Sequence, residues 1–142
     1  MTIREYYSKL QSIDLQKAKE DAVLANKEVI ISLNQGQLRL GRTAKDENIE
    51  PYYSDLYLKR KLKMSSYVAP AGIPDLYLTG AFVGAIDVIV DNGEYFLTSW
   101  DEKNGFLTNR YANIFGLTKE DIEQAQIFVT NTFIELIQNM LN

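Results

Sequence analysis

The sequence predicts one α+β domain spanning 1–142, in which long N-terminal and C-terminal helices pack on a small antiparallel sheet with a central hairpin. Three observations predict this class. Apolar residues recur at steps of three and four near both ends of the chain, which is the period of one helix face. A segment with strand alternation and an Asn-Gly turn lies between them. Neither an internal repeat nor a linker composition divides the 142 residues, a length that suits a single domain.

The composition of the chain excludes or disfavours several classes of function. Cys and His are both absent from the sequence, so disulfides, thiolate metal sites and the commonest general base are excluded. The formal net charge of -4 disfavours general binding to nucleic acid, which needs a basic face to neutralise phosphates. The opening residues lack the apolar core of a signal peptide, and no window approaches a membrane span, so we expect cytosolic synthesis.

The first third of the chain is expected to form two helices. The first is short and amphipathic, with apolar positions at Ile3, Tyr6, Tyr7 and Leu10. The second covers about 14–35, and its apolar positions at helical spacing are Leu15, Ala18, Ala22, Ala25, Val29 and Leu33. Asp14 can cap its start, and Gly36 stands where a left-handed C-terminal residue is preferred. The alanines at its start would let another backbone approach closely.

The next three segments alternate between loop and helix. The segment 39–53 is polar and lacks apolar periodicity, so it is expected to be an exposed loop or a loose hairpin, and it is long enough to be an extended arm. A helix is predicted from Tyr53 to Met64, where aromatic or aliphatic residues alternate with charges. The segment Ser65–Pro74 contains prolines and a glycine and is expected to be a second loop.

The clearest strand pattern follows. Ile86, Val88 and Val90 alternate along a first strand, Asp91-Asn92-Gly93 supplies the turn, and Glu94–Thr98 runs back. This pattern predicts a β-hairpin. A short helix is expected from Phe106 to Phe115, ending at Gly116.

A final helix of about twenty residues is predicted to start at Thr118, with Asp121 completing a capping signal. Its main apolar face has the positions Ile122, Ala125, Val129, Phe133, Leu136 and Met140. Further apolar residues widen that face, namely Ile127, Phe128, Ile134, Ile137 and Leu141. Two alternatives follow: the helix is sandwiched inside the domain, or it also meets a neighbouring subunit.

Carboxylates are the only catalytic option worth testing, and none of them has a recognisable acid/base or metal-binding spacing. The candidates are Asp46, Glu47, Glu50, Asp55, Asp75, Asp87, Asp91, Asp101 and Glu102. The glycines at 80 and 84 lack a phosphate-loop lysine, and Ser65-Ser66 lacks the companions of an activated serine. We therefore expect a protein that is not an enzyme and has no catalytic, metal or cofactor site.

A basic run stands out in this acidic chain, formed by Lys59, Arg60, Lys61 and Lys63. It is either a solvated helix face balanced by nearby acids or an electrostatic contact to an acidic partner or to passing DNA. Tyr53 and Tyr57 precede it and are further interface candidates, because tyrosine is favoured at protein interfaces.

Two segments around the hairpin carry a family resemblance. Ile73–Phe82 holds Leu-Thr-Gly-Ala-Phe, and Arg110–Thr118 holds Tyr-Ala-Asn-Ile-Phe-Gly. With Leu33-Asn34-Gln35-x-Gln37-Leu38, Tyr53 and Tyr57 upstream, this resembles the tail-completion, or virion-morphogenesis, proteins of tailed phages, over roughly 33–137. The residues that carry the motif are Thr79, Gly80, Phe82, Tyr111, Phe115 and Gly116. The chain departs from the family pattern where a His is common before the Phe-Gly pair, and at Gly84-Ala85, where a polar residue is expected.

The resemblance implies a structural subunit of a phage particle, found in the virion and made in the host cytoplasm. It implies a head–tail connector that forms a symmetric homo-oligomeric ring between portal and tail, with portal, connector or tail proteins as partners and no cofactor or membrane. Under this resemblance the loop 39–53 and the termini would interlock, and the basic run would line a channel for DNA. Two other classes stay open: a small non-catalytic adaptor or regulatory protein that binds one phage or host partner, and an enzyme that uses carboxylates.

Overall fold

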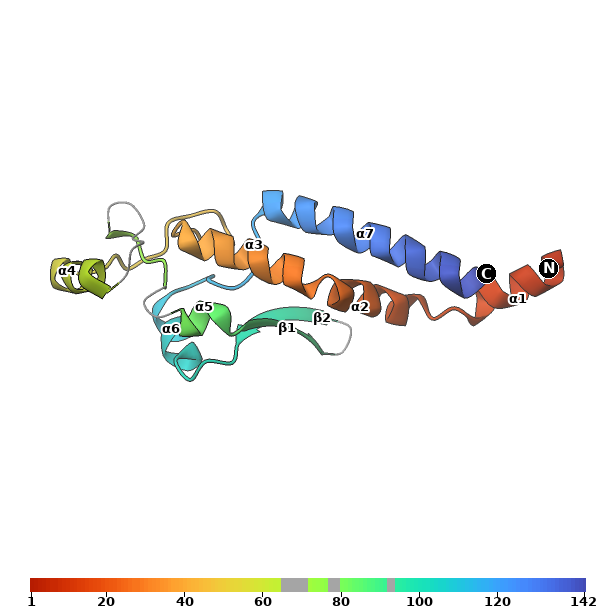
Figure 1. Cartoon of the computed structure of the whole chain (residues 1–142), viewed down its shortest axis with the longest axis horizontal. Helices are drawn as coiled ribbons and strands as arrows, with labels where there is room; N and C mark the ends of the chain where they lie inside the picture. The colour runs from red at the N-terminus through yellow and green to blue at the C-terminus, as the bar shows by residue number, and fades with distance from the viewer. Residues whose placement is uncertain (65–71, 77–79, 92–93) are drawn as a thin grey trace.

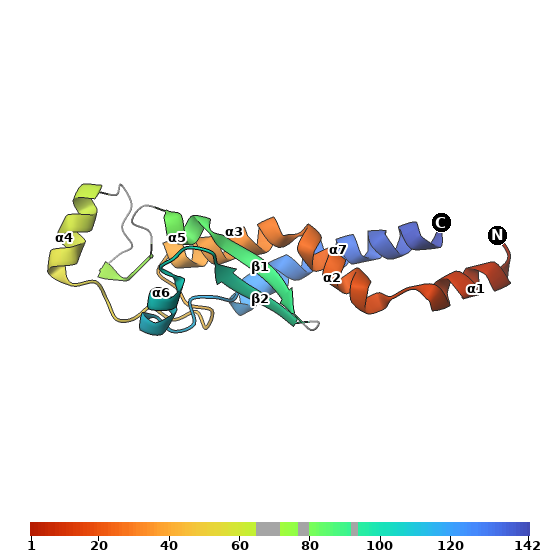
Figure 2. The ribbon, with the colours of Figure 1, turned by 90° about the horizontal axis from the view of Figure 1, so that it is seen from below.

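The computed structural model describes residues 1–64, 72–76, 80–91 and 94–142, and the chain forms an α+β fold as the sequence predicts. In chain order the elements are α1 (Ile3–Ser12), α2 (Leu15–Ala25), α3 (Lys27–Arg39), α4 (Asp55–Met64), α5 (Ala81–Gly84), β1 (Ile86–Asp91), β2 (Glu94–Ser99), α6 (Asn104–Arg110) and α7 (Lys119–Leu141). The molecule is elongated, with α7 on one side of α2 and α3 and the hairpin on the other (Figure 1). α1 and α4 lie at opposite ends of the long axis in both views (Figures 1 and 2).

The first predicted helix is confirmed, and the second is divided. α1 begins with a capping box in which the Thr2 hydroxyl accepts from Glu5 N and the Glu5 carboxylate accepts from Thr2 N. Asp14 caps α2 as predicted, accepting from Lys17 N at 3.0 Å. The prediction of one continuous helix over 14–35 is wrong, because Asn26 leaves the helical conformation with φ -109° and ψ 17°.

Asn26 interrupts the helix for a physical reason. Its side-chain Nδ2 donates to Ala22 O and to Thr132 Oγ1 on α7, both at 2.8 Å. Such side-chain bonds compete with the helical backbone pattern. α3 then continues through Gly36 to Arg39, so the predicted helix end at Gly36 is also wrong. The glycine with a left-handed backbone after α3 is Gly41, at φ 72°.

α2 and α7 approach each other closely at the predicted alanines. Ala18 and Ala22 are fully buried, and α7 packs along α2. α7 starts at the predicted cap, where the Thr118 hydroxyl accepts from Asp121 N at 3.3 Å. The buried residues of these two fully described helices are alanines, at 18, 22 and 125. The alanines themselves bury little apolar area, and bulkier residues of α7, such as Phe133 and Leu136, are half-buried.

The hairpin pairs in the register that the predicted turn requires. Ile86 lies opposite Ser99 and Asp91 lies opposite Glu94, while the turn residues 92–93 lie outside the described residues. Ile86 and Val88 are buried, and β1 packs on α3. These two apolar residues of the predicted alternation therefore face the core.

The segment 39–53 forms a loop that folds back on itself after the last residue of α3. Arg42 and Asn48 form an isolated bridge, Ile49 is fully buried, and Ala44 N donates to Asn113 O at 2.8 Å. This packing favours the loop over the extended arm. Of the second predicted loop, 65–71 lie outside the described residues and Gly72–Leu76 are described.

The short helix predicted from Phe106 to Phe115 is wrong in its bounds, because α6 starts at Asn104 and ends at Arg110. Tyr111 leaves the helix at φ -119° and ψ 117°, and Asn113 has a left-handed φ of 58°. Tyr111 and Ile114 are both buried in the core. The chain therefore turns after α6, and both side chains enter the core from a non-helical segment.

The main apolar core lies around α3, α5, β1 and the 111–115 segment, and its buried residues are Ile31, Leu38, Ile49, Leu76, Phe82, Val83, Ile86, Val88, Tyr111 and Ile114. Phe82 occupies its centre, 4 % exposed and with its ring centroid 5.9 Å from that of Phe115. Ile86, at the start of β1, is buried in the same core.

Replacing Phe82 by alanine should lower the free energy of unfolding by about 3–5 kcal/mol, because the lost ring leaves a cavity. Urea unfolding followed by circular dichroism measures this. Leu56→Ala is the control, since Leu56 is 73 % exposed and its loss should change stability by less than about 0.5 kcal/mol. An unchanged midpoint for Phe82→Ala would show that Phe82 is not a core anchor.

Candidate functional site

The basic run does not form one charged face. Lys59, Arg60 and Lys63 are exposed on α4, but Lys61 is 0 % exposed. Its ammonium lies 2.8 Å from Asp75 Oδ1, and Asp75 is fully buried as well. The predicted solvent or partner role of Lys61 is therefore wrong. A buried charge needs a counter-charge, and Asp75 supplies it from a segment outside α4.

Tyr53 completes this buried cluster. Its hydroxyl donates to Asp75 Oδ1 at 3.3 Å and accepts from Leu76 N at 3.2 Å. Burial, and then the nearby Asp75 carboxylate, raise the pKa of the Tyr53 hydroxyl above its ordinary value, so it stays protonated and can donate. Tyr57 lies four residues before Lys61, on the same face of α4, and its ring centroid is 4.7 Å from that of Tyr53. Both tyrosines are half-buried, so they attach α4 to the body.

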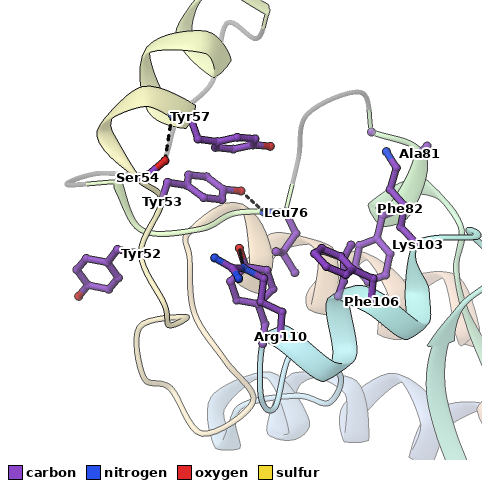
Figure 3. A pocket seen from close by; sticks show the side chains of 13 residues that line it. Tyr52, Tyr53, Ser54, Tyr57, Leu76, Ala81, Phe82, Lys103, Phe106 and Arg110 are labelled. Atoms are coloured by element: carbon purple, nitrogen blue, oxygen red, sulfur yellow. Dashed lines mark hydrogen bonds between the residues drawn. The ribbon is translucent and has the colours of Figure 1, made fainter.

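A cavity of about 420 Å³ opens beside this cluster. Figure 3 shows Tyr53 and Tyr57 extending from the start of α4 toward Phe82, Phe106 and Arg110, which come from α5 and α6. Its aromatic lining residues are Tyr52, Tyr53, Tyr57, Phe82, Phe106 and Tyr111. Lys103 and Arg110 are its cations, and the Arg110 guanidinium lies 5.6 Å from the Tyr111 ring centroid.

The lining of the cavity is mainly aromatic and cationic, and its titratable side chains are those of lysine, arginine and tyrosine. None of the described residues that line it is a carboxylate, although such a group was the remaining catalytic option. Ser54 Oγ accepts from Tyr57 N at 3.2 Å and so caps α4. Aromatic walls with two cations suit a segment that presents an aromatic or acidic side chain.

Three amides on α3 hold together the segments that carry the motif residues. Asn34 Nδ2 donates to Ile114 O and Gly116 O, both at 3.1 Å. Gln37 donates to Gly116 O at 2.9 Å and accepts from Thr118 N at 2.8 Å. Gln35 donates to Val83 O at 2.9 Å.

The remaining motif residues divide between the core, tight turns and undescribed positions. Phe82 and Tyr111 are buried, Phe115 is partly buried, and Gly80 and Gly116 have positive φ angles of 85° and 116°. Thr79 lies outside the described residues. The motif residues that the structure describes thus serve packing and turns.

The outward side of α7 carries a largely apolar row, which we name the outer stripe. Its residues follow one another at steps of three and four: the exposed Ile127, Thr130 and Ile134, and the half-buried Ile137 and Leu141. Ile127 is 62 % exposed and Ile134 is 46 % exposed. Of the two alternatives for the final helix, the sandwiched one is therefore wrong.

Sequence reasoning missed two features of the site. The pairing of Lys61 with Asp75 has no local signal apart from the Tyr57–Lys61 spacing, because the partner lies 14 residues further on. The role of Asn34 and Gln37 could have been suspected from two amides near the apolar positions of a helix.

Among the residues that the structure describes, no group of three or more acidic side chains is placed to hold a metal ion. Within the same part of the chain, none of the helices combines the length and the apolar character needed to span a bilayer. No protein-family model, curated protein or solved structure matches the chain significantly.

Replacing Lys61 by alanine should destabilise the protein by about 3–5 kcal/mol, because it removes the ammonium that neutralises the buried Asp75 carboxylate. Urea unfolding measures the loss, and amide exchange over 55–64 should show whether α4 detaches.

Two controls separate charge pairing from a general effect. Lys63→Ala, at an exposed position of the same helix, should leave stability unchanged. The double variant Lys61→Met, Asp75→Asn should recover much of the loss, since the amide can still accept from Tyr53. Equal stability of Lys61→Ala and Lys63→Ala would contradict a stabilising pair.

A second prediction concerns Asp87, which bridges the hairpin to Trp100. The Trp100 indole N–H, 3.0 Å from Asp87 Oδ2, is the main cause that lowers the pKa of this carboxyl, helped by Val88 N–H and the Lys27 ammonium. A carboxyl with a lowered pKa stabilises the fold at pH above its unfolded value of about 3.9, and that stability is lost as pH falls through the folded pKa.

We expect Trp100→Phe to raise the pKa of Asp87 toward its ordinary value, measured by carbon-detected NMR titration. The stability difference between wild type and Trp100→Phe should also shrink as the pH is lowered. In an Asp87→Asn background that pH dependence should vanish. An unchanged Asp87 titration in Trp100→Phe would contradict the assignment.

Proposed function

We propose that this protein is a structural subunit of a phage particle, a head–tail connector or tail-completion protein that forms a symmetric ring between portal and tail. The observation that carries the proposal is the outer stripe of α7. One side of α7 packs on α2, yet the other leaves Ile127 and Ile134 exposed. Single exposed apolar residues are normal on a monomer, whereas a row at this spacing is a packing surface.

The shape of the chain supports assembly through unlike surfaces. α1 and α4 lie at opposite ends of an elongated molecule (Figures 1 and 2). α1 carries exposed apolar residues, and α4 carries three exposed cations. Contacts between unlike surfaces of identical copies generate rings when the rotation closes.

The phage assignment comes from the resemblance of the segments around the hairpin. Asn34, Gln35 and Gln37 tie α5 and the 114–118 segment to α3. The resembling parts are therefore one structural unit, which supports a scaffold role.

The experiment is mass spectrometry of purified particles from the source phage, with copies of this chain counted against the portal protein. Several copies per particle are expected for a connector. Absence from purified particles would overturn the proposal.

The exposed cations of α4 provide a further prediction. We expect the triple variant Lys59→Glu, Arg60→Glu, Lys63→Glu to fold normally and to reduce the yield of infectious particles, because the charges face an acidic neighbour or the DNA channel. Lys61 is left unchanged because it neutralises Asp75. A matched triple variant at the exposed lysines 17, 19 and 45 should assemble normally. Normal infectious yield from the α4 variant would remove this patch from the assembly mechanism.

The adaptor remains the second candidate, and the aromatic cavity favours it. A cavity of about 420 Å³ with Lys103 and Arg110 among its lining residues could receive a side chain of one partner protein. The solution mass separates the two, since an adaptor would stay monomeric at high concentration.

A further inference from the structure

α1 is an amphipathic helix that its own chain leaves largely uncovered. It has 10 residues, all of them described, and none is buried. Ile3 is 90 % exposed, and Tyr7 and Leu10 are exposed as well. Isolated helices shorter than about 12–15 residues are marginal in water. α1 therefore needs a cover beyond the end of α7 that it touches.

The outer stripe of α7 has the same pitch as the apolar row of α1. Ile127 and Ile134 are seven residues apart, and so are Ile3 and Leu10. At 1.5 Å per helical residue, each pair spans about 10 Å. Tyr7 lies between Ile3 and Leu10 on the same side of α1, so the two rows can pack residue against residue.

The charges select α1 as the partner of α7. α7 carries one lysine against four carboxylates, a net charge of -3: Lys119, Glu120, Asp121, Glu123 and Glu135. α1 carries Arg4 and Lys9 against Glu5, a net charge of +1. Two α7 helices side by side would repel each other, whereas α1 beside α7 brings opposite net charges together.

We propose that α1 of one copy packs on the outer stripe of α7 in a neighbouring copy. Only Ile13 and Asp14 separate α1 from α2, and they hold α1 beyond the C-terminal end of its own α7 (Figures 1 and 2). Ile127 lies in the N-terminal half of α7, out of reach of the same copy's α1. The inference rests on the proposed function in one respect, because it names the contact that joins neighbouring copies.

The contact is heterologous, since α1 and the outer stripe are different surfaces. Each copy then contributes its α1 to one neighbour and its outer stripe to another, which is the arrangement that closes into a ring or continues as a filament.

Cysteine cross-linking tests the contact directly, because the sequence contains no cysteine. One protein carries Tyr7→Cys, and the other carries Ile127→Cys or Ile134→Cys. Mixed under mild oxidation, Tyr7→Cys should form a disulfide with at least one α7 variant. Lys45→Cys, on an exposed loop, is the control and should not react with Tyr7→Cys above background. Dimers of Ile134→Cys with itself, in place of the mixed product, would overturn the proposal in favour of α7–α7 pairing.

A charge exchange provides the second measurement. Arg4→Glu with Lys9→Glu should weaken self-association by at least about tenfold in Kd. Adding Glu123→Lys with Glu135→Lys should restore it, as measured by analytical ultracentrifugation. The double variant Ile127→Glu, Ile134→Glu should remain folded, since both positions are exposed, and should be monomeric.

The outcomes separate this contact from the proposed function. An oligomer without the mixed disulfide overturns the contact and leaves the ring subunit in place. A monomer that is absent from purified particles overturns both.

Discussion

The amides of α3 are the constraint on which the rest of the structure depends. Asn34 and Gln37 are buried, and buried amides must find hydrogen-bond partners. Their side chains bond to Ile114, Gly116 and Thr118, the residues that lead into α7, although Asn34 Oδ1 has no hydrogen-bond partner in the part of the chain that the structure describes. The direction of α7 is thus set where it begins, and its long body follows α2 from there. Gln35 fixes α5 from the same helix.

The molecule consequently has two ends with different means of stabilisation. Near α3, aromatic and aliphatic residues from α5, β1 and the 111–115 segment form a dense core. Along α2 and α7 the buried residues are alanines, which contribute little burial energy each. The fully described helix α1 adds no buried residue at all. The first end is stable through its own packing, and the second depends on what lies against it.

Much of this fold follows from local sequence patterns. The caps at Asp14 and Thr118 and the strand alternation of β1 are short-range features, so the sequence alone predicts them. The break at Asn26 does not follow, because its cause is a hydrogen bond to Thr132, 106 residues away. The end of α6 does not follow from local sequence either. Tyr111 and Ile114 lie after the helix and pack in a core to which other elements contribute.

The candidate site shows the same division. Lys59, Arg60 and Lys63 are exposed, as expected of a basic run. Lys61 has the same charge as these neighbours, but it is buried. Only its partner Asp75 distinguishes it, and no local pattern identifies that partner. The sequence alone left two alternatives for the final helix. An apolar residue on a second helix face can contact either the same chain or another one, so its exposure is not predicted.

The difference between the two ends also bears on the choice between ring subunit and adaptor. The aromatic cavity belongs to the end that is stable through its own core, so the fold does not need an occupant there. The α1 and α7 surfaces belong to the end whose helices lack bulky buried residues. A monomeric adaptor would have to keep that end ordered alone, at the entropic cost of holding a short exposed helix. A copy in a ring gains the missing apolar contacts from its neighbour, which makes self-association the more economical explanation of this architecture.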